Sequence, residues 1–97
     1  IDNTPPSVTM KQEAVEKGRV RLAIEAVDPT STLNQAEVSV DAGEWRAVFP
    51  KDGIADSKAE SFSYLSPELN SGEHVIAFRI YDQNDNVGMN KLVIRIP

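Results

Sequence analysis

In the stretch RVRLAIEAVD, residues 19–28, every second residue from Val20 to Ala26 is apolar. A period of two places such residues on one face of a β-strand, whereas a helix needs a period of 3.6. The same alternation recurs in HVIAFRIYD, residues 74–82. Both stretches are rich in the β-branched and aromatic residues that strands favour. They therefore predict two long strands, each with one buried face.

The rest of the chain carries the same signal in shorter runs, separated by turn sequences. The sequence EKG at residues 16–18 closes one hairpin, and DAGE at residues 41–44 closes a second tight one. We expect Gly43 to take a positive φ there, because glycine has no Cβ. Residues 50–57 and 66–72 are longer loops. The predicted strands are residues 7–12, 19–28, 36–41, 44–49, 60–65, 74–82 and 91–96.

These signals predict an all-β fold, an antiparallel seven-strand sandwich with one core between two sheets. Pro5-Pro6 cannot continue a hydrogen-bonded ladder, so residues 1–6 are assigned to an N-terminal linker. Residues 7–97 are assigned to a single β-sandwich domain, because 97 residues suffice for one modest core. The chain opens abruptly at Ile1 without a cleavable signal peptide, so we expect it to be a fragment of a longer protein.

Composition excludes several classes of function. The formal net charge is −5 and the isoelectric point is near 4.7, with no run of basic residues, so we expect no nucleic-acid partner. No apolar run approaches the roughly 20 residues that span a bilayer, so we expect no membrane span. Cysteine is absent, which excludes disulfides, thiol catalysis and thiolate metal sites.

The order of these signals resembles bacterial immunoglobulin-like and fibronectin type III-like modules. The matching stretches are DNTPPSVT, EAVDPTSTL, VSVDAGEW and LNSGEHVIAFRIYDQNDN, which together span nearly the whole chain. The resemblance implies an immunoglobulin-like (fibronectin type III-like) sandwich, repeated or appended in secreted and envelope proteins. Two loops depart from the family pattern. Asp85 stands where the final turn usually carries Gly, and Ser31-Thr32-Leu33 replaces the usual Ser-Gly-Ile.

The single histidine, His74, is the only candidate for a catalytic base of the Ser-His or Cys-His type. By parity it shares the inward face of its strand with Ile76 and Phe78. In the modules that this chain resembles, a tyrosine at a similar position ties this corner to the preceding loop. We therefore prefer a corner or core role for His74 over a general base, and we expect no enzymatic activity.

Charged residues on the outward strand faces form a complementary set. If the topology is fibronectin-like, Glu37 and Asp41 on one strand face Arg79 on the next, with Lys91 and Arg95 on the strand beyond. Opposite charges on neighbouring strands are the expected pairing on a solvated face. Each exposed pair contributes about 0.2–1 kcal/mol, so we interpret the set as solubility and register rather than as a binding site.

Trp45 is a candidate ligand-binding residue, because sandwich modules that bind glycans use planar rings. Trp45 and Phe49 share a parity, and the chain has only six aromatic residues in total. A sandwich of this size needs several aromatic residues in its core. We therefore prefer a core position for Trp45, with a glycan platform as the alternative.

Acidic residues from distant parts of the chain are predicted to meet at one end of the sandwich. Connections between antiparallel strands alternate between the two ends. The loops at residues 28–34, 50–59 and 82–88 therefore share an end with residues 1–6. The Asp and Asn residues gathered there are Asp2, Asn3, Asp28, Asp52, Asp56, Asp82, Asn84, Asp85 and Asn86.

This acidic end raises the hypothesis that Asp28, Asp82 and Asp85 bind calcium, which takes about six to eight oxygen ligands. The sequence DQNDN at residues 82–86 resembles the D-x-N-D-N calcium motif of cadherin linkers. There, however, the motif follows the last strand and joins two domains. Asp and Asn are also common turn formers, because their side chains accept hydrogen bonds from nearby backbone N–H groups. We prefer the turn interpretation.

These observations favour a non-enzymatic structural or protein-interaction module of a larger exported bacterial protein, in an extracellular or periplasmic location. We expect its partner to be a neighbouring domain of the same chain, with another protein or a glycan as further options. The alternative is a glycan- or peptide-ligand-binding module, with calcium as an optional stabilising cofactor.

Overall fold

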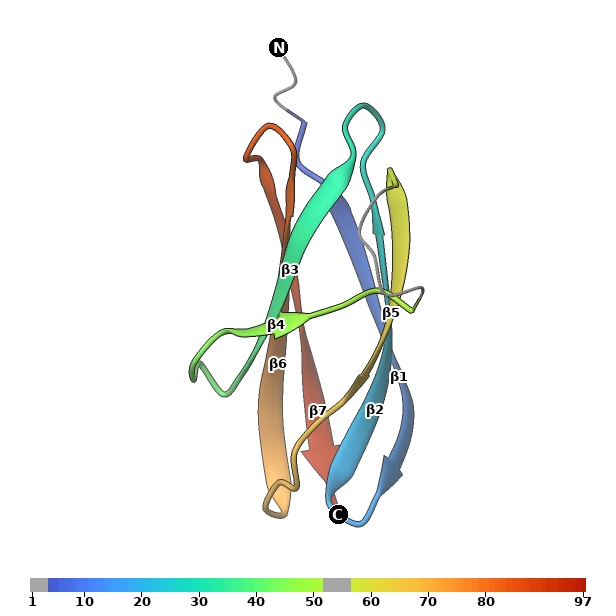
Figure 1. Ribbon diagram of the computed structural model, residues 1–97. Coiled ribbons are helices and arrows are strands. Elements are labelled where there is room, and N and C mark those ends of the chain that lie inside the picture. The colour runs from blue at the N-terminus through green and yellow to red at the C-terminus, as the bar shows by residue number, and fades with distance from the viewer. Residues whose placement is uncertain (1–3, 52–56) are drawn as a thin grey trace.

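The alternating runs fold into two antiparallel sheets, as the sequence predicts (Figure 1). The computed structural model describes residues 4–51 and 57–97. One sheet has the order β1-β2-β5 and the other the order β4-β3-β6-β7. The described residues form no helix, and so none that could cross a membrane. The strands are β1 (Ser7–Glu16), β2 (Arg19–Val27), β3 (Leu33–Val40), β4 (Arg46–Val48), β5 (Ala59–Leu65), β6 (Gly72–Asp82) and β7 (Val87–Ile96).

The core lies between the two sheets. In most strands it is built from residues of one parity, and in β1 and β3 the parity changes at an irregularity in the register, between Gln12 and Ala14 and between Leu33 and Ala36. Burying a side chain such as Leu or Ile stabilises the fold by about 1.5–3 kcal/mol. Phe62 of β5 and Phe78 of β6 meet edge to face across the core, with ring centroids 5.1 Å apart and planes at 61°. The fully buried apolar side chains include Val20, Leu22 and Ile24 of β2, Leu33 of β3, and Ile76 and Ile80 of β6.

The tight turns use the conformations that two-residue hairpins require. Lys17 and Gly18 have φ values of 52° and 79°, and Asp41 and Ala42 have values of 53° and 59°. The prediction of a positive φ at Gly43 is therefore wrong, because this turn has its two left-handed residues one position earlier. Gly43 instead closes the turn, where its N–H donates to Val40 O at 2.9 Å. A Cβ on Gly43 would lie 2.9 Å from that same oxygen, so glycine is needed for the close approach.

One long side of the sandwich is closed where β1 packs against β7. Asn90 Nδ2 donates to Val8 O at 2.9 Å, which links the two strands. The buried Pro6 passes so close to Gly88 that a Cβ there would lie 2.1 Å from the Pro6 carbonyl oxygen. The last residue of the assigned linker is thus packed against β7. Residues 1–3 lie outside the described part of the chain.

The molecule is long and narrow, with extents of 45 × 24 × 19 Å. The chain enters at one end of the long axis, and β7 leaves at the other (Figure 1). The loops that follow β2 and β6 lie at the first end. The turn between β1 and β2 and the loop after β5 lie at the second end (Figure 1). The two ends therefore carry different sets of loops, as the alternation of antiparallel connections predicts.

Candidate functional site

The loops after β2 and β6 are joined to each other at the N-terminal end of the sandwich. Gln83 N–H donates to Thr32 O at 3.0 Å, and Asn84 Nδ2 donates to Ser31 Oγ at 2.8 Å. The predicted meeting of these two loops is therefore confirmed. Four other residues assigned to the acidic end lie outside the described residues, namely Asp2, Asn3, Asp52 and Asp56.

Asp28 and Asp82 are buried where their strands end, and their carboxylates organise the turns that follow. Asp82 Oδ1 accepts the backbone N–H groups of Asn84 and Asn86 at 2.8 and 3.0 Å, and its Oδ2 accepts Asn86 Nδ2 at 3.0 Å. Asp28 Oδ1 accepts the N–H groups two and three residues ahead, at 2.9 and 2.8 Å. These are the side-chain-to-backbone bonds that the turn interpretation describes.

Asp85 lies exposed in the loop after β6, with a φ of 62°. Aspartate tolerates this left-handed conformation better than most residues, which explains how it can occupy a position where similar modules carry Gly. Residues 4–51 and 57–97 contain no cluster of three or more His, Cys, Asp or Glu side chains that could hold a metal ion. The calcium site at Asp28, Asp82 and Asp85 stays a prediction.

His74 ties the corner of β6 to two loops. Its Nδ1 donates to Asp41 Oδ2 at 2.6 Å, and its Nε2 donates to the Asn70 carbonyl oxygen at 2.7 Å. Asp41 Oδ1 also accepts the Val75 N–H at 2.9 Å. The His74 side chain is 14% exposed, so it lies at the rim rather than in the core. Both ring nitrogens are engaged, which leaves neither available as a general base in this arrangement.

Both members of this pair have shifted pKa values. The hydrogen bond to Asp41, together with that to the Asn70 carbonyl, raises the pKa of His74 above its ordinary value of 6.5. The hydrogen bond from His74, with that from the Val75 N–H, lowers the pKa of Asp41 below its ordinary value of 3.8. Each partner favours the charged form of the other, so the folded chain stabilises an imidazolium–carboxylate pair.

Trp45 lies on the outer face of the four-stranded sheet, so its predicted core position is wrong. The guanidinium of Arg79 stacks 4.0 Å from its ring centre, while Arg79 Nε donates to Glu37 Oε1 at 2.9 Å. Phe49 is 71% exposed, so it too lies outside the core. The Glu37–Arg79 pairing across β3 and β6 is as predicted. Because Arg79 covers one face of the Trp45 ring, the ring has at most one face for a glycan, and that role stays a prediction.

The residue pattern did not point to a groove on the long side opposite the β1–β7 contact. This groove has a volume of about 660 Å³ and runs between the edge strands β4 and β5. Its lining includes the exposed Phe49 and Leu65 and the half-buried Tyr64. The chain crosses from one sheet to the other beside it, where Lys51 N–H donates to Ser61 O at 2.8 Å.

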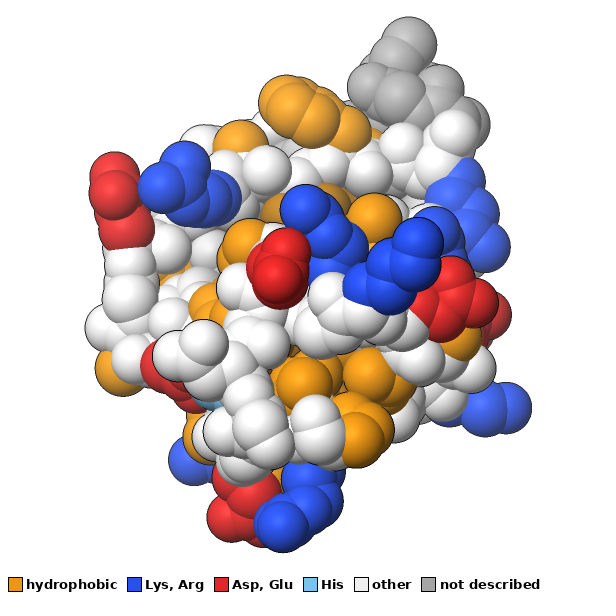
Figure 2. All heavy atoms as spheres, turned by 90° about the horizontal axis from the view of Figure 1, so that it is seen from below, with side chains coloured by type: hydrophobic (Ala, Val, Ile, Leu, Met, Phe, Trp, Pro, Cys, Tyr) orange, Lys and Arg blue, Asp and Glu red, His pale blue; other side chains and the backbone are white. Residues whose placement is uncertain are grey.

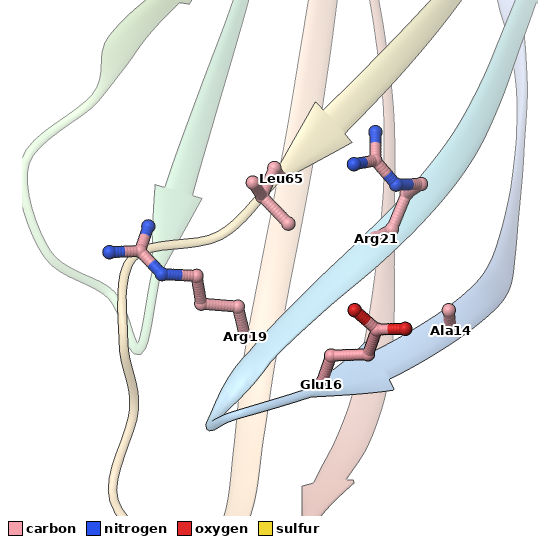
Figure 3. Close-up of a pocket in the computed structure, with 5 residues that line it drawn as sticks. All are labelled: Ala14, Glu16, Arg19, Arg21 and Leu65. Atoms are coloured by element: carbon pink, nitrogen blue, oxygen red, sulfur yellow. The ribbon is translucent and has the colours of Figure 1, made fainter.

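Leu65 also borders a second, smaller pocket of about 230 Å³ on the outer face of the three-stranded sheet. Figure 3 shows Leu65 between the side chains of Arg19 and Arg21, with Glu16 on the neighbouring strand β1. Seen from below, Lys and Arg side chains lie next to exposed hydrophobic ones (Figure 2). We define the groove and this pocket together as the Leu65 site. The sequence shows only that Arg19 and Arg21 share the outward parity of their strand, and the structure places Arg21 opposite Leu65.

No protein-family model matches the chain, and a search of curated proteins finds no match. Its function is therefore argued from the fold and the geometry of these sites.

The His74–Asp41 pair predicts a stability that depends on pH. Because the pKa of His74 is raised on folding, its contribution is fully present below pH 6.5 and is lost as the pH rises through the raised value. We expect the free energy of unfolding of the wild type, measured with urea, to fall across this range. Asp41→Asn removes the carboxylate, so its curve should be flatter. Parallel curves for the two proteins would contradict the pairing.

Asp82 predicts a loss of stability that does not depend on calcium. Asp82→Ala leaves the Asn84 and Asn86 N–H groups without their acceptor, so we expect about 2 kcal/mol lower stability in urea. The exposed substitution Asp85→Ala removes a charge from the same loop and serves as a control for charge, although it also alters a left-handed residue. The loss should be the same with chelator and with millimolar calcium. A wild-type melting temperature that rises with calcium would instead support the metal site.

Proposed function

We propose that this chain is a non-enzymatic structural or protein-interaction module of a larger exported bacterial protein. The observation that carries the proposal is that the first described residues and the end of β7 lie at opposite ends of a 45 Å long axis (Figure 1). A domain with this geometry extends a chain when it is placed between neighbours. A domain whose ends lie side by side instead forms a lateral insertion.

The strand order supports a fibronectin type III-like assignment within the immunoglobulin-like sandwiches. Here β4 pairs with β3 and leaves β1, β2 and β5 as a separate sheet. In constant-type immunoglobulin domains the fourth strand instead joins the sheet of the first two. The exported bacterial setting rests on the loop sequences that resemble modules of secreted and envelope proteins.

The surroundings of the single histidine support a non-enzymatic role. Both nitrogens of His74 hold structural partners, namely Asp41 and the Asn70 carbonyl. A histidine that activates a nucleophile needs one nitrogen directed at that nucleophile. The same contacts support the corner role, because they fasten β6 to the loop that precedes it and to the turn after β3.

The spacer geometry is tested by small-angle X-ray scattering on a tandem of two copies in chain order, with the single copy as the control. We expect a maximum dimension of about twice the 45 Å long axis, because the second copy starts where the first ends. A tandem whose maximum dimension stays close to that of the single copy would mean that the copies fold back side by side, and would overturn the spacer role.

A further inference from the structure

The edge of β5 that faces the groove has backbone groups that no other described residue pairs with. Ser66, directly after β5, donates its N–H to Val20 O at 2.9 Å. Because hydrogen-bonded pairs alternate along an antiparallel ladder, the even-numbered residues of β5 are the ones whose backbone groups bond to β2. The odd-numbered residues therefore direct their N–H and C=O groups to the other edge. Lys51 N–H occupies Ser61 O, but within the described residues no partner takes the backbone groups of Ser63 and Leu65 on that side.

The same parity sets what lies on each face of this edge. The side chains of Phe62 and Tyr64 point inward, and Tyr64 lines the groove with Val48 and Phe49. The side chain of Leu65 points outward and is 47% exposed. A strand added beside β5 would therefore place alternate side chains in an apolar groove and on the outer face of the three-stranded sheet.

The outer face beside Leu65 carries Arg19 and Arg21, with the carboxylate of Glu16 in the same pocket (Figure 3). Among the described residues Arg19 and Arg21 form no ion pair, and their nearest polar contacts are Ser66 O at 3.5 Å and Ser63 Oγ at 3.4 Å. Arg46, which lines the groove, reaches Glu44 only at 4.0 Å, with both side chains largely exposed. Three arginines set against Glu16 and Glu44 leave a local excess of positive charge in a chain of net charge −5, and this excess is complementary to an acidic ligand.

This charge argues against a second copy of the chain as the occupant. Two copies paired through β5 about a twofold axis would bring their Arg21 and Arg46 side chains towards each other. The groove also opens on a long side of the molecule, whereas neighbouring domains of the proposed module would attach at its two ends (Figure 1). A segment of a different protein fits both observations.

We propose that the free edge of β5 docks an extended segment of another protein, in which acidic residues alternate with apolar ones. The added strand bonds the backbone of Ser63 and Leu65. Its apolar side chains enter the groove, and its carboxylates meet Arg19 and Arg21. This inference rests on the proposed role as an interaction module and names the surface and the chemistry of the partner.

The test is a titration with a labelled nine-residue peptide of alternating Glu and Val, followed by fluorescence anisotropy and by amide NMR shifts. We expect saturable binding that moves the Ser63 and Leu65 amide signals. A peptide with Lys in place of Glu is the ligand control, and we expect it not to bind. Equal binding of both peptides, no binding of the Glu peptide at millimolar concentration, or a chain that dimerises through β5 would each overturn the proposal.

Two variants and a matched control locate the site. Ser63→Pro removes a free edge N–H that the β2 ladder does not use, so the fold should persist while strand addition is blocked. Arg21→Glu reverses a charge on the outer face. We expect each to weaken binding by about tenfold or more, and Arg95→Glu, an exposed arginine on β7 of the other sheet, to leave it unchanged.

Thermal melts measured by circular dichroism show whether each variant folds. If Ser63→Pro does not fold, binding by Arg21→Glu alone tests the docking site. Full-strength binding by a folded Ser63→Pro or Arg21→Glu protein overturns the inference. Its failure is distinguishable from that of the spacer role. An extended tandem with no peptide binding removes the docking site alone, and a compact tandem that binds the peptide removes the spacer role alone.

Discussion

Two sheets can share one dry core only if every strand keeps its apolar side chains on the inner face, which requires a single parity except where a bulge shifts the register, as in β1 and β3. In β6, Ile76 and Phe78 satisfy this condition, and the alternate residues, such as Arg79, lie on the outer face. The same parity decides which edge each backbone N–H group addresses. One constraint therefore fixes the core, the outward ion pair of Arg79 and the direction of the free groups along β5.

The two long sides of the sandwich differ in how their edge strands are covered. On one side the N-terminal segment crosses to β7, where Pro6 packs on Gly88 and Asn90 bonds Val8. On the other side β4 is only three residues long and leaves a groove beside β5. Sheet edges with free backbone groups attract further strands, and proteins commonly cover or charge them. The arginines beside Leu65 would repel the same edge of a second copy and attract the acidic segment that we propose as the ligand.

The period of two predicted the existence of the seven strands, although β1, β3 and β7 are longer and β4 is shorter than predicted. The meeting of the loops after β2 and β6 followed from the alternation of antiparallel connections, and the Glu37–Arg79 pair followed from the fibronectin-like strand order. The position of Trp45 was wrong for a related reason. Parity shows that Trp45 and Phe49 share a face, but in a three-residue strand it does not show which face is buried. The structure puts Val48 towards the core instead.

The Leu65 site could not be predicted from the pattern because it depends on where the chain changes sheets. The sequence between β4 and β5 carries no hydrophobic period, so the groove between these two strands appears only in three dimensions. The sequence also could not show why the turn after β3 needs glycine at position 43. Both a left-handed residue and a close backbone approach select glycine, and the structure shows the second reason.

The claim that parity leaves one edge of β5 open is tested most directly by amide hydrogen exchange measured by NMR. Phe62 and Tyr64, whose N–H groups face β2, should exchange slowly, because their exchange requires the ladder to open. Ser63 and Leu65 should exchange at rates close to those of an unprotected peptide. Strong protection of all four amides would show that the β5 edge is already covered, and would contradict the account.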